Sequence, residues 1–322
     1  MRIGWLSFHI VGEKALTYLL NDDRSIDAVI TLNDKEASRR SGVFDYSDLC
    51  LKNNVPIYKI DHINSDQSIT LLKQLDLDIV FVIGWSQIID KQILSIPRLG
   101  MVGVHSSLLP HNRGSAPVNW SLINGEQETG STLMLLAEGV DTGDIIDQIS
   151  FPVTLYDSCK TIYDRVADAN ITMIRKLYDN IHCGNFPHIP QDTNTLESIL
   201  PRRKPKDGVI DWNNTSIDLY NFIRAQTRPY PGTYSFIDNN KYYILQSAFF
   251  PKLFDDLSIV SGEVIGPVYS TVIDACGVLV KCDDSFLLVL EIEDEKGNII
   301  KGKMLNEFFT KGSIFSSERN VC

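Results

Sequence analysis

The sequence has no apolar run that reaches the roughly 18 residues needed for a membrane-spanning helix. Its first 20 residues also lack the basic region and the small-residue cleavage site of a secretory signal peptide. It contains no internal repeat and no low-complexity tract. These absences lead us to expect a cytoplasmic protein with no membrane partner.

Cysteine is scarce, and none of the six cysteines forms a CxxC pair with another. Isolated thiols of this kind are typical of proteins from a reducing compartment. Metal-ligand spacing is absent, and Gly4 and Gly12 match the GxGxxG pattern of a dinucleotide site poorly. We therefore predict no bound metal and no NAD.

Basic residues are in the minority, with 30 Lys+Arg against 41 Asp+Glu and a formal net charge of -11. Residues 201–322 share this deficit, because they hold 14 Lys+Arg and 16 Asp+Glu. Binding a long nucleic acid requires an excess of Lys and Arg that neutralises phosphates. The composition therefore argues against a long nucleic acid as partner, while it allows a local basic patch for one small anion.

The first 150 residues alternate short apolar runs with longer amphipathic ones. Runs rich in Val, Ile and Phe predict strands at 2–8, 27–32, 56–60, 78–84 and 101–104. Helical spacing lies between them at 12–20, 46–53 and 68–74. Such alternation predicts an α/β fold whose mostly parallel sheet is covered by helices on both faces.

The rest of the chain predicts a change of structural class. Two more strands at 134–136 and 145–153 precede a long helix at 159–181. After a helix at 216–225, alternating strands with Asn-Asn and Asp-Asp turns run through 232–290, which predicts a small β-rich domain. We divide the chain into a first domain (1–182), a loop-rich linker (183–209) and a C-terminal domain (210–322).

One histidine stands where a parallel sheet binds its ligands. His105 directly follows the fifth predicted strand, and ligands bind at the carboxyl ends of such strands. An imidazole can accept or donate a proton near neutral pH, and it is usually oriented by a carboxylate. Asp141, in the glycine-bracketed loop GVDTGD, is a candidate for that carboxylate. Residue types alone do not show that the two side chains meet, and a lone histidine at a strand end is more often structural.

A stretch of some forty residues carries a more specific signal: HSSLLPHNRGSAPVNWSLINGEQETGSTLMLLAEGVDTGDII. It closely resembles the signature of formyltransferases that use 10-formyltetrahydrofolate, with a His in H-x-S-L-L-P, an R-G loop and a D-x-G-D loop about 36 residues later. The matching positions are His105, 107–110, 113–114 and 141–144. Residues 205–212 and 224–237 look like the entry to the C-terminal domain of the methionyl-tRNA and aminosugar enzymes of this family.

The resemblance implies a Rossmann-like domain followed by a small, OB-like β-domain, and the activity of an N-formyltransferase. It also implies that His105 serves the proton transfers and contacts the oxyanion, while Asp141 fixes or polarises the ring. The implied co-substrate is 10-formyltetrahydrofolate. The residues implied to bind it are Trp85, Ser86, Ile88, Gly139, Val140, Thr142, Gly143 and Asp144.

The chain departs from the family pattern at one position. The family usually carries Asn two residues before the histidine, where its amide helps to hold the formyl oxygen, but here that residue is Gly103. Loss of one oxyanion donor commonly costs on the order of a hundredfold in rate. We hypothesise that Gln87, at the end of the neighbouring strand, supplies the missing donor. A backbone N–H or a bound water are the alternatives.

The acceptor amine is the open question. Our leading interpretation is a nucleotide-linked amino-deoxy sugar, the substrate of enzymes that build surface polysaccharides such as the lipopolysaccharide O-antigen. Arginine forks suit a diphosphate, and the linker and the following segment supply several arginines. The predicted substrate-binding residues are Ser107, Leu109, Arg113, Gly114, Asn119, Arg202, Arg203 and Arg228. For each linker arginine, a solvated basic loop is an equally good interpretation.

Two alternatives stay open. Length and domain order fit methionyl-tRNA formyltransferase, but the acidic C-terminal region does not. A catalytically silent folate-binding or scaffold module is motivated by Gly103, although the retained His105 and Asp141 argue against it. A homodimer is plausible for the family. The sequence does not identify the sugar, the nucleotide or the amino position.

Overall fold

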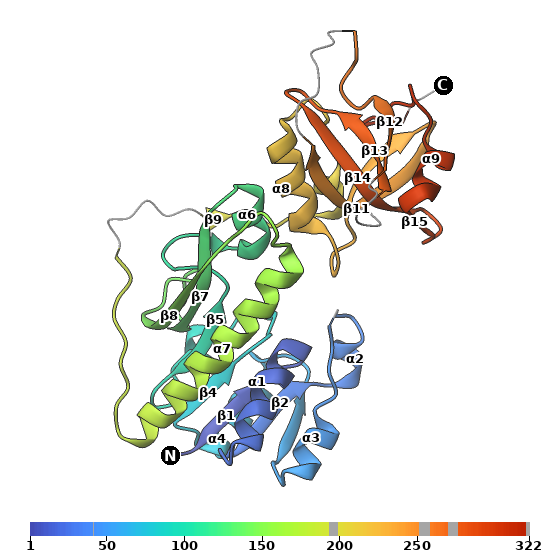
Figure 1. Cartoon of the computed structure of the whole chain (residues 1–322). Coiled ribbons are helices and arrows are strands. Elements are labelled where there is room, and N and C mark those ends of the chain that lie inside the picture. The colour runs from blue at the N-terminus through green and yellow to red at the C-terminus, as the bar shows by residue number, and fades with distance from the viewer. Residues whose placement is uncertain (41, 193–198, 251–257, 270–275, 320–322) are drawn as a thin grey trace. The chain divides into compact units, whose positions relative to one another are not determined.

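The computed structural model describes residues 1–40, 42–192, 199–250, 258–269 and 276–319 (Figure 1). The chain divides into two compact units. Unit 1 comprises 1–115, 129–151 and 164–200, and unit 2 comprises 116–128, 152–163 and 201–322. Residues 116–128 and 152–163 therefore belong to the unit that contains the C-terminal part of the chain, although they precede residue 182. A hydrogen bond attaches the segment 116–128 to this unit, because Asn119 Nδ2 donates to the carbonyl oxygen of Ala225 at 2.5 Å.

Unit 1 is built on a seven-stranded sheet in the order β3-β2-β1-β4-β5-β7-β8. Its strands are β1 (Ile3–Leu6), β2 (Ala28–Leu32), β3 (Ile57–Ile60), β4 (Ile79–Val82), β5 (Met101–His105), β7 (Glu128–Leu135) and β8 (Ile145–Pro152). The first five strands pair in parallel, and β7 runs antiparallel to β5. The predicted mostly parallel sheet is therefore confirmed.

Helices cover both faces of this sheet. They are α1 (Ile10–Asn21), α2 (Asp34–Ala37), α3 (Ser47–Lys52), α4 (Asp66–Leu75), α5 (Lys91–Leu94) and α7 (Cys159–His182). The helix α6 (Pro117–Ile123) belongs to unit 2. Alternate strand residues point to opposite faces. Trp5 and Phe81 join a core with α1, α3 and α7, whereas Leu6 and Val80 join a separate core with α4 and α5.

The strand β7 begins six residues before the sequence pattern indicated. Its first half is polar, which hides the strand from an analysis based on apolar runs. Ser131 and Thr132 are nevertheless fully buried, because each hydroxyl has a partner: Ser131 Oγ donates to Asn170 Oδ1 at 2.6 Å, and Thr132 Oγ1 donates to the carbonyl of Ser107 at 2.6 Å. Hydrogen bonding thus offsets the cost of burying these groups.

Unit 2 contains an antiparallel six-stranded sheet in the order β10-β11-β14-β13-β12, with β15 on β14. Its strands are β10 (Thr233–Ile237), β11 (Asn240–Phe250), β12 (Val264–Tyr269), β13 (Cys276–Lys281), β14 (Phe286–Asp294) and β15 (Ile299–Lys301), and its other helices are α8 (Ser216–Gln226) and α9 (Leu305–Phe308). Asp238 and Asn239 close the β10–β11 hairpin with φ of 47° and 66°, as a two-residue turn of this kind requires. The predicted β-rich domain is confirmed.

Within the described ranges, no helix combines the length and the apolarity that crossing a membrane requires. The described cysteines Cys50, Cys159, Cys183, Cys276 and Cys282 are free thiols. Cys322 lies outside the described residues.

Candidate active site

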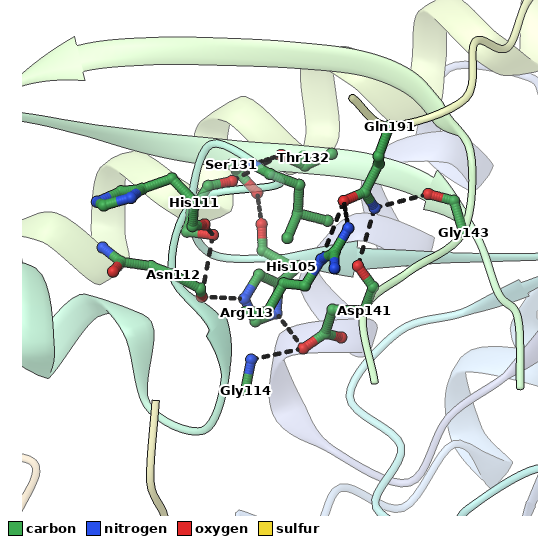
Figure 2. A network of polar contacts seen from close by, with 12 residues as sticks. His105, His111, Asn112, Arg113, Gly114, Ser131, Thr132, Asp141, Gly143 and Gln191 are labelled. Carbon is green, nitrogen blue, oxygen red and sulfur yellow. Dashed lines mark hydrogen bonds and ion pairs between the residues drawn. The ribbon is translucent and has the colours of Figure 1, made fainter. Parts of the chain in front are cut away.

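His105 is the last residue of β5 and lies at the carboxyl edge of the sheet (Figure 2). His9 follows β1 and Trp85 follows β4 at the same edge. The strand order turns back between β1 and β4, which is the point where open α/β sheets bind ligands. The fold therefore places His105 beside the expected ligand crevice, as the sequence predicted.

The imidazole of His105 has a partner at each nitrogen. Nδ1 lies 3.5 Å from Oδ2 of Asp141, and Nε2 lies 2.8 Å from the carbonyl oxygen of Asn112. Figure 2 shows the ring held between these two oxygens. The carbonyl oxygen can only accept, so Nε2 carries the hydrogen of that bond. The structure thus brings together the two residues on which the predicted chemistry depends.

Asp141 has a constrained backbone, and its two carboxylate oxygens have different surroundings. Its φ is 53°, in the left-handed region that Asp tolerates better than most residues. Oδ2 faces His105 and also accepts a hydrogen bond from the backbone N–H of Gly114 at 2.9 Å. Within the described ranges, Oδ1 has no hydrogen-bond partner, and the side chain is 20% exposed. Asp141 therefore keeps one carboxylate oxygen available as an acceptor.

Two predicted substrate-binding residues instead build the loop behind His105. The buried Ser107 hydroxyl donates to the carbonyl oxygens of His111 and Asn112. Leu109 is also buried, and its N–H donates to Thr132 Oγ1 at 3.1 Å. These contacts fix the Asn112 carbonyl against the His105 ring. The substrate contacts of Ser107 and Leu109 stay a prediction, and both side chains are buried in this structure.

Arg113, another predicted substrate-binding residue, is also held inside the protein. The side chain is only 2% exposed, and both Nε and Nη2 donate to Oε1 of Gln191, at 3.1 and 2.6 Å. A guanidinium committed in this way cannot form a fork with a substrate phosphate. Its neighbour Gly114 contacts the site through its backbone N–H to Asp141, and not through a substrate contact.

The loop that carries Asp141 depends on glycine. A Cβ atom on Gly143 would lie 1.7 Å from the carbonyl oxygen of Leu135, which is a backbone atom of β7. At Gly139, a Cβ would lie 2.4 Å from Oγ1 of Thr142. The two glycines therefore allow the loop to fold back onto the end of the strand.

We expect Gly143→Ala to lower kcat about tenfold to a hundredfold, because the loop must move away from Leu135 and carry Asp141 with it. Steady-state kinetics of formyl transfer measures this effect. Gly208→Ala is the control, since its φ is not positive and the atom nearest to a Cβ there lies 3.3 Å away. An unchanged kcat in Gly143→Ala would show that the position of the loop does not matter for the chemistry.

The structure also explains the glycine at position 103. Residues 103 and 105 point to the same face of β5, because side chains alternate along a strand. A Cβ on Gly103 would lie 2.7 Å from Cδ2 of Leu136. Leu136 thus occupies the space in which the family asparagine would lie.

We expect Gly103→Asn to destabilise the protein by about 1–3 kcal/mol, the usual cost of overpacking. Leu136→Ala should relieve this clash, so the double variant is expected to lose less stability than the two single variants together. Urea unfolding of the four proteins completes the cycle. Strictly additive losses would contradict the assignment of Leu136 as the obstructing side chain.

The hypothesis that Gln87 replaces the missing donor is not supported. Oε1 of Gln87 accepts a hydrogen bond from the N–H of Ile63 at 2.8 Å, and Nε2 donates to the carbonyl of Asp61 at 3.1 Å. The side chain therefore ties the loop after β4 to residues 61–63, and its amide is directed there.

Apolar and polar groups for a bound molecule gather around the loops after β4 and β7. Ile88 is 84% exposed and Val140 is 60% exposed. The indole Nε1 of Trp85 is buried and has no hydrogen-bond partner within the described ranges. Ser86 Oγ accepts from Arg40 Nη1 at 3.1 Å. Burial lowers the pKa of His9, which favours its neutral form.

The remaining predicted substrate-binding residues belong to unit 2. Buried Asn119 donates to the Ala225 carbonyl, so its amide has a structural partner. Arg203 lies over the rings of Trp120 and Phe222, at 5.0 and 5.4 Å, and donates to Gln226 Oε1. Substrate binding by Asn119 and Arg203 stays a prediction, and both residues have partners within the protein.

Arg202 and Arg228 are the last two predicted substrate-binding residues. Arg228 forms an ion pair with Glu293, so binding of an anion at Arg228 competes with this contact. Arg202 is exposed.

Sequence reasoning missed three contributors to the site. The carbonyl of Asn112 and the N–H of Gly114 are backbone groups, which no residue-type argument identifies. Gln191 lies in the segment interpreted as a linker, and its donors reach the carbonyls of Asp141 and Gly143. The described residues contain no group of three or more His, Cys, Asp or Glu arranged to hold a metal ion.

Comparison with protein families gives two matches. The family described as "Formyl transferase" matches residues 21–177, and "Formyl transferase, C-terminal domain" matches residues 202–309. A methionyl-tRNA formyltransferase from Citrifermentans bemidjiense is 31% identical over 252 residues, which cover 77% of this chain and 79% of that protein. The bifunctional polymyxin resistance protein ArnA of Wigglesworthia glossinidia brevipalpis is 31% identical over 300 residues. That match covers 93% of this chain but only 44% of ArnA.

Solved structures share the fold. WlaRD, a sugar 3N-formyl transferase crystallised in the presence of dTDP and 5-N-formyl-THF, aligns with a TM-score of 0.62 at 20% identity and covers 90% of this chain and 97% of its own. An N-formyltransferase from Helicobacter canadensis, in complex with folinic acid and dTDP-3-aminofucose, aligns with a TM-score of 0.63 at 18% identity, with 90% and 98% covered.

Proposed function

This chain belongs to the formyl transferase family, and on that premise we propose that it transfers the formyl group of 10-formyltetrahydrofolate to the primary amine of a nucleotide-linked amino-deoxy sugar. The observation that carries the proposal is the His105 imidazole held between Asp141 and the Asn112 carbonyl at the carboxyl edge of the sheet.

The residues at this edge fit a folate. Exposed Ile88 and Val140 offer apolar contacts to a flat ring system. Relatives of the same fold were crystallised with 5-N-formyl-THF or folinic acid. We therefore assign the loops after β4 and β7, which carry residues 85–88 and 139–144, to the co-substrate.

Formyl transfer requires three events that the His105–Asp141 pair can serve. A neutral amine attacks the formyl carbon, and the resulting adduct has a positive nitrogen and a negative oxygen. A proton leaves the attacking nitrogen, and the folate nitrogen gains a proton as its bond to carbon breaks. The products are the formamide and tetrahydrofolate, so charge and protons balance.

The geometry suggests how the pair divides this work. Both ring nitrogens of His105 are engaged, whereas Asp141 Oδ1 has no partner within the described ranges. Oδ1 is the acceptor that an incoming ammonium-like nitrogen can reach, and the adjacent imidazole compensates the changes in charge as the proton moves. Ring and carboxylate thus act as one proton-transferring unit.

The choice of a sugar amine rests on charge and on relatives. Residues 201–322 are net acidic, which disfavours a tRNA. Two structures of this fold are described as sugar-directed or carry a dTDP-aminosugar. Since Arg113 and Arg203 are committed within the protein, Arg202 and Arg228 are the arginines that we retain for the nucleotide phosphates.

One observation favours a second candidate. The methionyl-tRNA formyltransferase of Citrifermentans bemidjiense aligns over most of its own length, which ArnA does not. Formylation of initiator tRNA therefore remains the alternative activity of the same site.

The test is to incubate the protein with 10-formyltetrahydrofolate and a panel of nucleotide-linked aminosugars, with charged initiator tRNA in a parallel reaction. Mass spectrometry should detect a gain of one formyl group on a sugar nucleotide only. Formylation of the tRNA alone would select the alternative. Folate binding without any product would indicate a catalytically silent module.

A further inference from the structure

A buried glutamine lies directly behind the loop that carries Asp141. Gln191 is 7% exposed, and its Nε2 donates to the carbonyl oxygens of Asp141 and Gly143, at 2.8 and 2.7 Å (Figure 2). Its Oε1 accepts two hydrogen bonds from the guanidinium of Arg113. An amide has two N–H donors and two lone pairs, so all four are used.

The two bonds from Nε2 hold a turn that is not favourable by itself. Asp141 has a φ of 53°, and a non-glycine residue in this region carries a conformational cost. The carbonyls of Asp141 and Gly143 flank Thr142, so a common donor fixes the backbone on both sides of that residue. The direction of the Asp141 side chain depends on this backbone.

A second route from Gln191 reaches the same carboxylate. Arg113, which binds Oε1 of Gln191, is followed by Gly114, whose N–H donates to Asp141 Oδ2. Gln191 is therefore linked to Asp141 in two ways. It binds the backbone carbonyl of Asp141 directly, and it binds Arg113, whose neighbour Gly114 donates to the Asp141 carboxylate. Shifting the amide disturbs both ends of Asp141.

The segment that carries Gln191 is held by further contacts within unit 1. Ile189 and Ile145 exchange two backbone hydrogen bonds of 2.8 Å, and Nδ1 of His188 lies 2.8 Å from Oδ2 of Asp144. Further along, β9 (Ile199–Leu200) pairs in parallel with β6 (Arg113–Gly114). The segment thus contacts both the Asp141 loop and the Arg113–Gly114 strand.

We propose that Gln191 is a positioning residue for the His105–Asp141 pair, and this role rests on the formyl-transfer function proposed above. Misplacing a reacting group by about 1 Å can cost on the order of a hundredfold in rate. The contact between Nδ1 and Oδ2 is already long, at 3.5 Å, so the pair is sensitive to small displacements of the loop.

Gln191→Glu separates positioning from folding. The isosteric carboxylate keeps an acceptor for Arg113 and places its other oxygen against two carbonyls, where it cannot donate. We expect a folded protein with kcat lowered about tenfold or more, and KM for each substrate changed less than threefold. The matched control is Asn53→Asp, the same amide-to-carboxylate change in unit 1, which removes a donor to the Leu49 carbonyl at the C-terminal end of α3.

A second readout does not need turnover. Long-range ¹H–¹⁵N spectra report the protonation of each histidine ring nitrogen, and we expect the His105 signals to change in Gln191→Glu but not in Asn53→Asp. An unchanged His105 spectrum with an unchanged kcat would overturn the proposal. Absence of formylation in the wild type, together with a changed His105 spectrum, would refute the proposed function and leave the positioning role supported. Should Gln191→Glu fail to fold, Gln191→Asn takes its place. Its side chain is one methylene shorter, so its amide cannot reach the same two carbonyls.

Discussion

His105→Asn is expected to lower kcat for formyl transfer by about 10²–10⁴-fold, the usual contribution of a positioned general acid or base. Asparagine keeps a polar amide near the position of Nδ1, whereas the bond from Nε2 to the Asn112 carbonyl is lost with the ring. What asparagine cannot do is gain or lose a proton near neutral pH. The loss should therefore fall on kcat, because the residue lies beside the reacting atoms and not in the folate loops.

The matched control for this variant is His111→Asn, which makes the same change at an exposed histidine six residues further along the chain. Calorimetric titration with 10-formyltetrahydrofolate should give a Kd within about threefold of wild type for both variants. A His105→Asn protein that retains wild-type kcat would remove the imidazole from the mechanism, whatever its position in the structure.

Asp141→Asn is expected to lower kcat by about 10²–10⁴-fold as well, because it removes the charge that faces the His105 ring. Asparagine is nearly isosteric and tolerates the left-handed backbone of this position, so the loop should keep its conformation. Its Oδ1 can still accept from the Gly114 N–H. The variant therefore tests the charge and the proton-accepting oxygen rather than the fold.

A control for the second variant is Asp147→Asn, which neutralises a carboxylate of β8 that pairs with Lys176 on α7. Surface ion pairs of this kind contribute little, so activity within about twofold of wild type is expected. Equal losses in both aspartate variants would mean that the effect comes from general charge, and not from the pair with His105.

The fold was predictable where runs of apolar residues mark the buried strands. The short runs of Val and Ile gave the five parallel strands within a few residues, because both faces of such a sheet are buried. The pattern failed at β7, where Ser131 and Thr132 are buried with hydrogen-bonded hydroxyls. A polar residue is indistinguishable from a surface residue until its partner is known.

The structure brings the two central residues of the predicted site together and gives two arginines at its margin partners inside the protein. Motif spacing identified His105 and Asp141, which the structure places in contact. Residue type suggested Arg113 and Arg203 for a phosphate, yet one binds Gln191 and the other lies over Trp120 and Phe222. An arginine serves equally well as an anion ligand and as a buried structural donor, so type alone does not separate the two.

The amino-acid sequence by itself determined the class of fold, the family and the residues of the proton-transferring pair, since these follow from periodic burial and from motif spacing along the chain. Only the tertiary structure decided what holds that pair in place. A backbone carbonyl at Asn112, a backbone N–H at Gly114 and an amide 50 residues away at Gln191 converge on it. Hydrogen bonds depend on the distance and direction between atoms, and these exist only after the chain has folded.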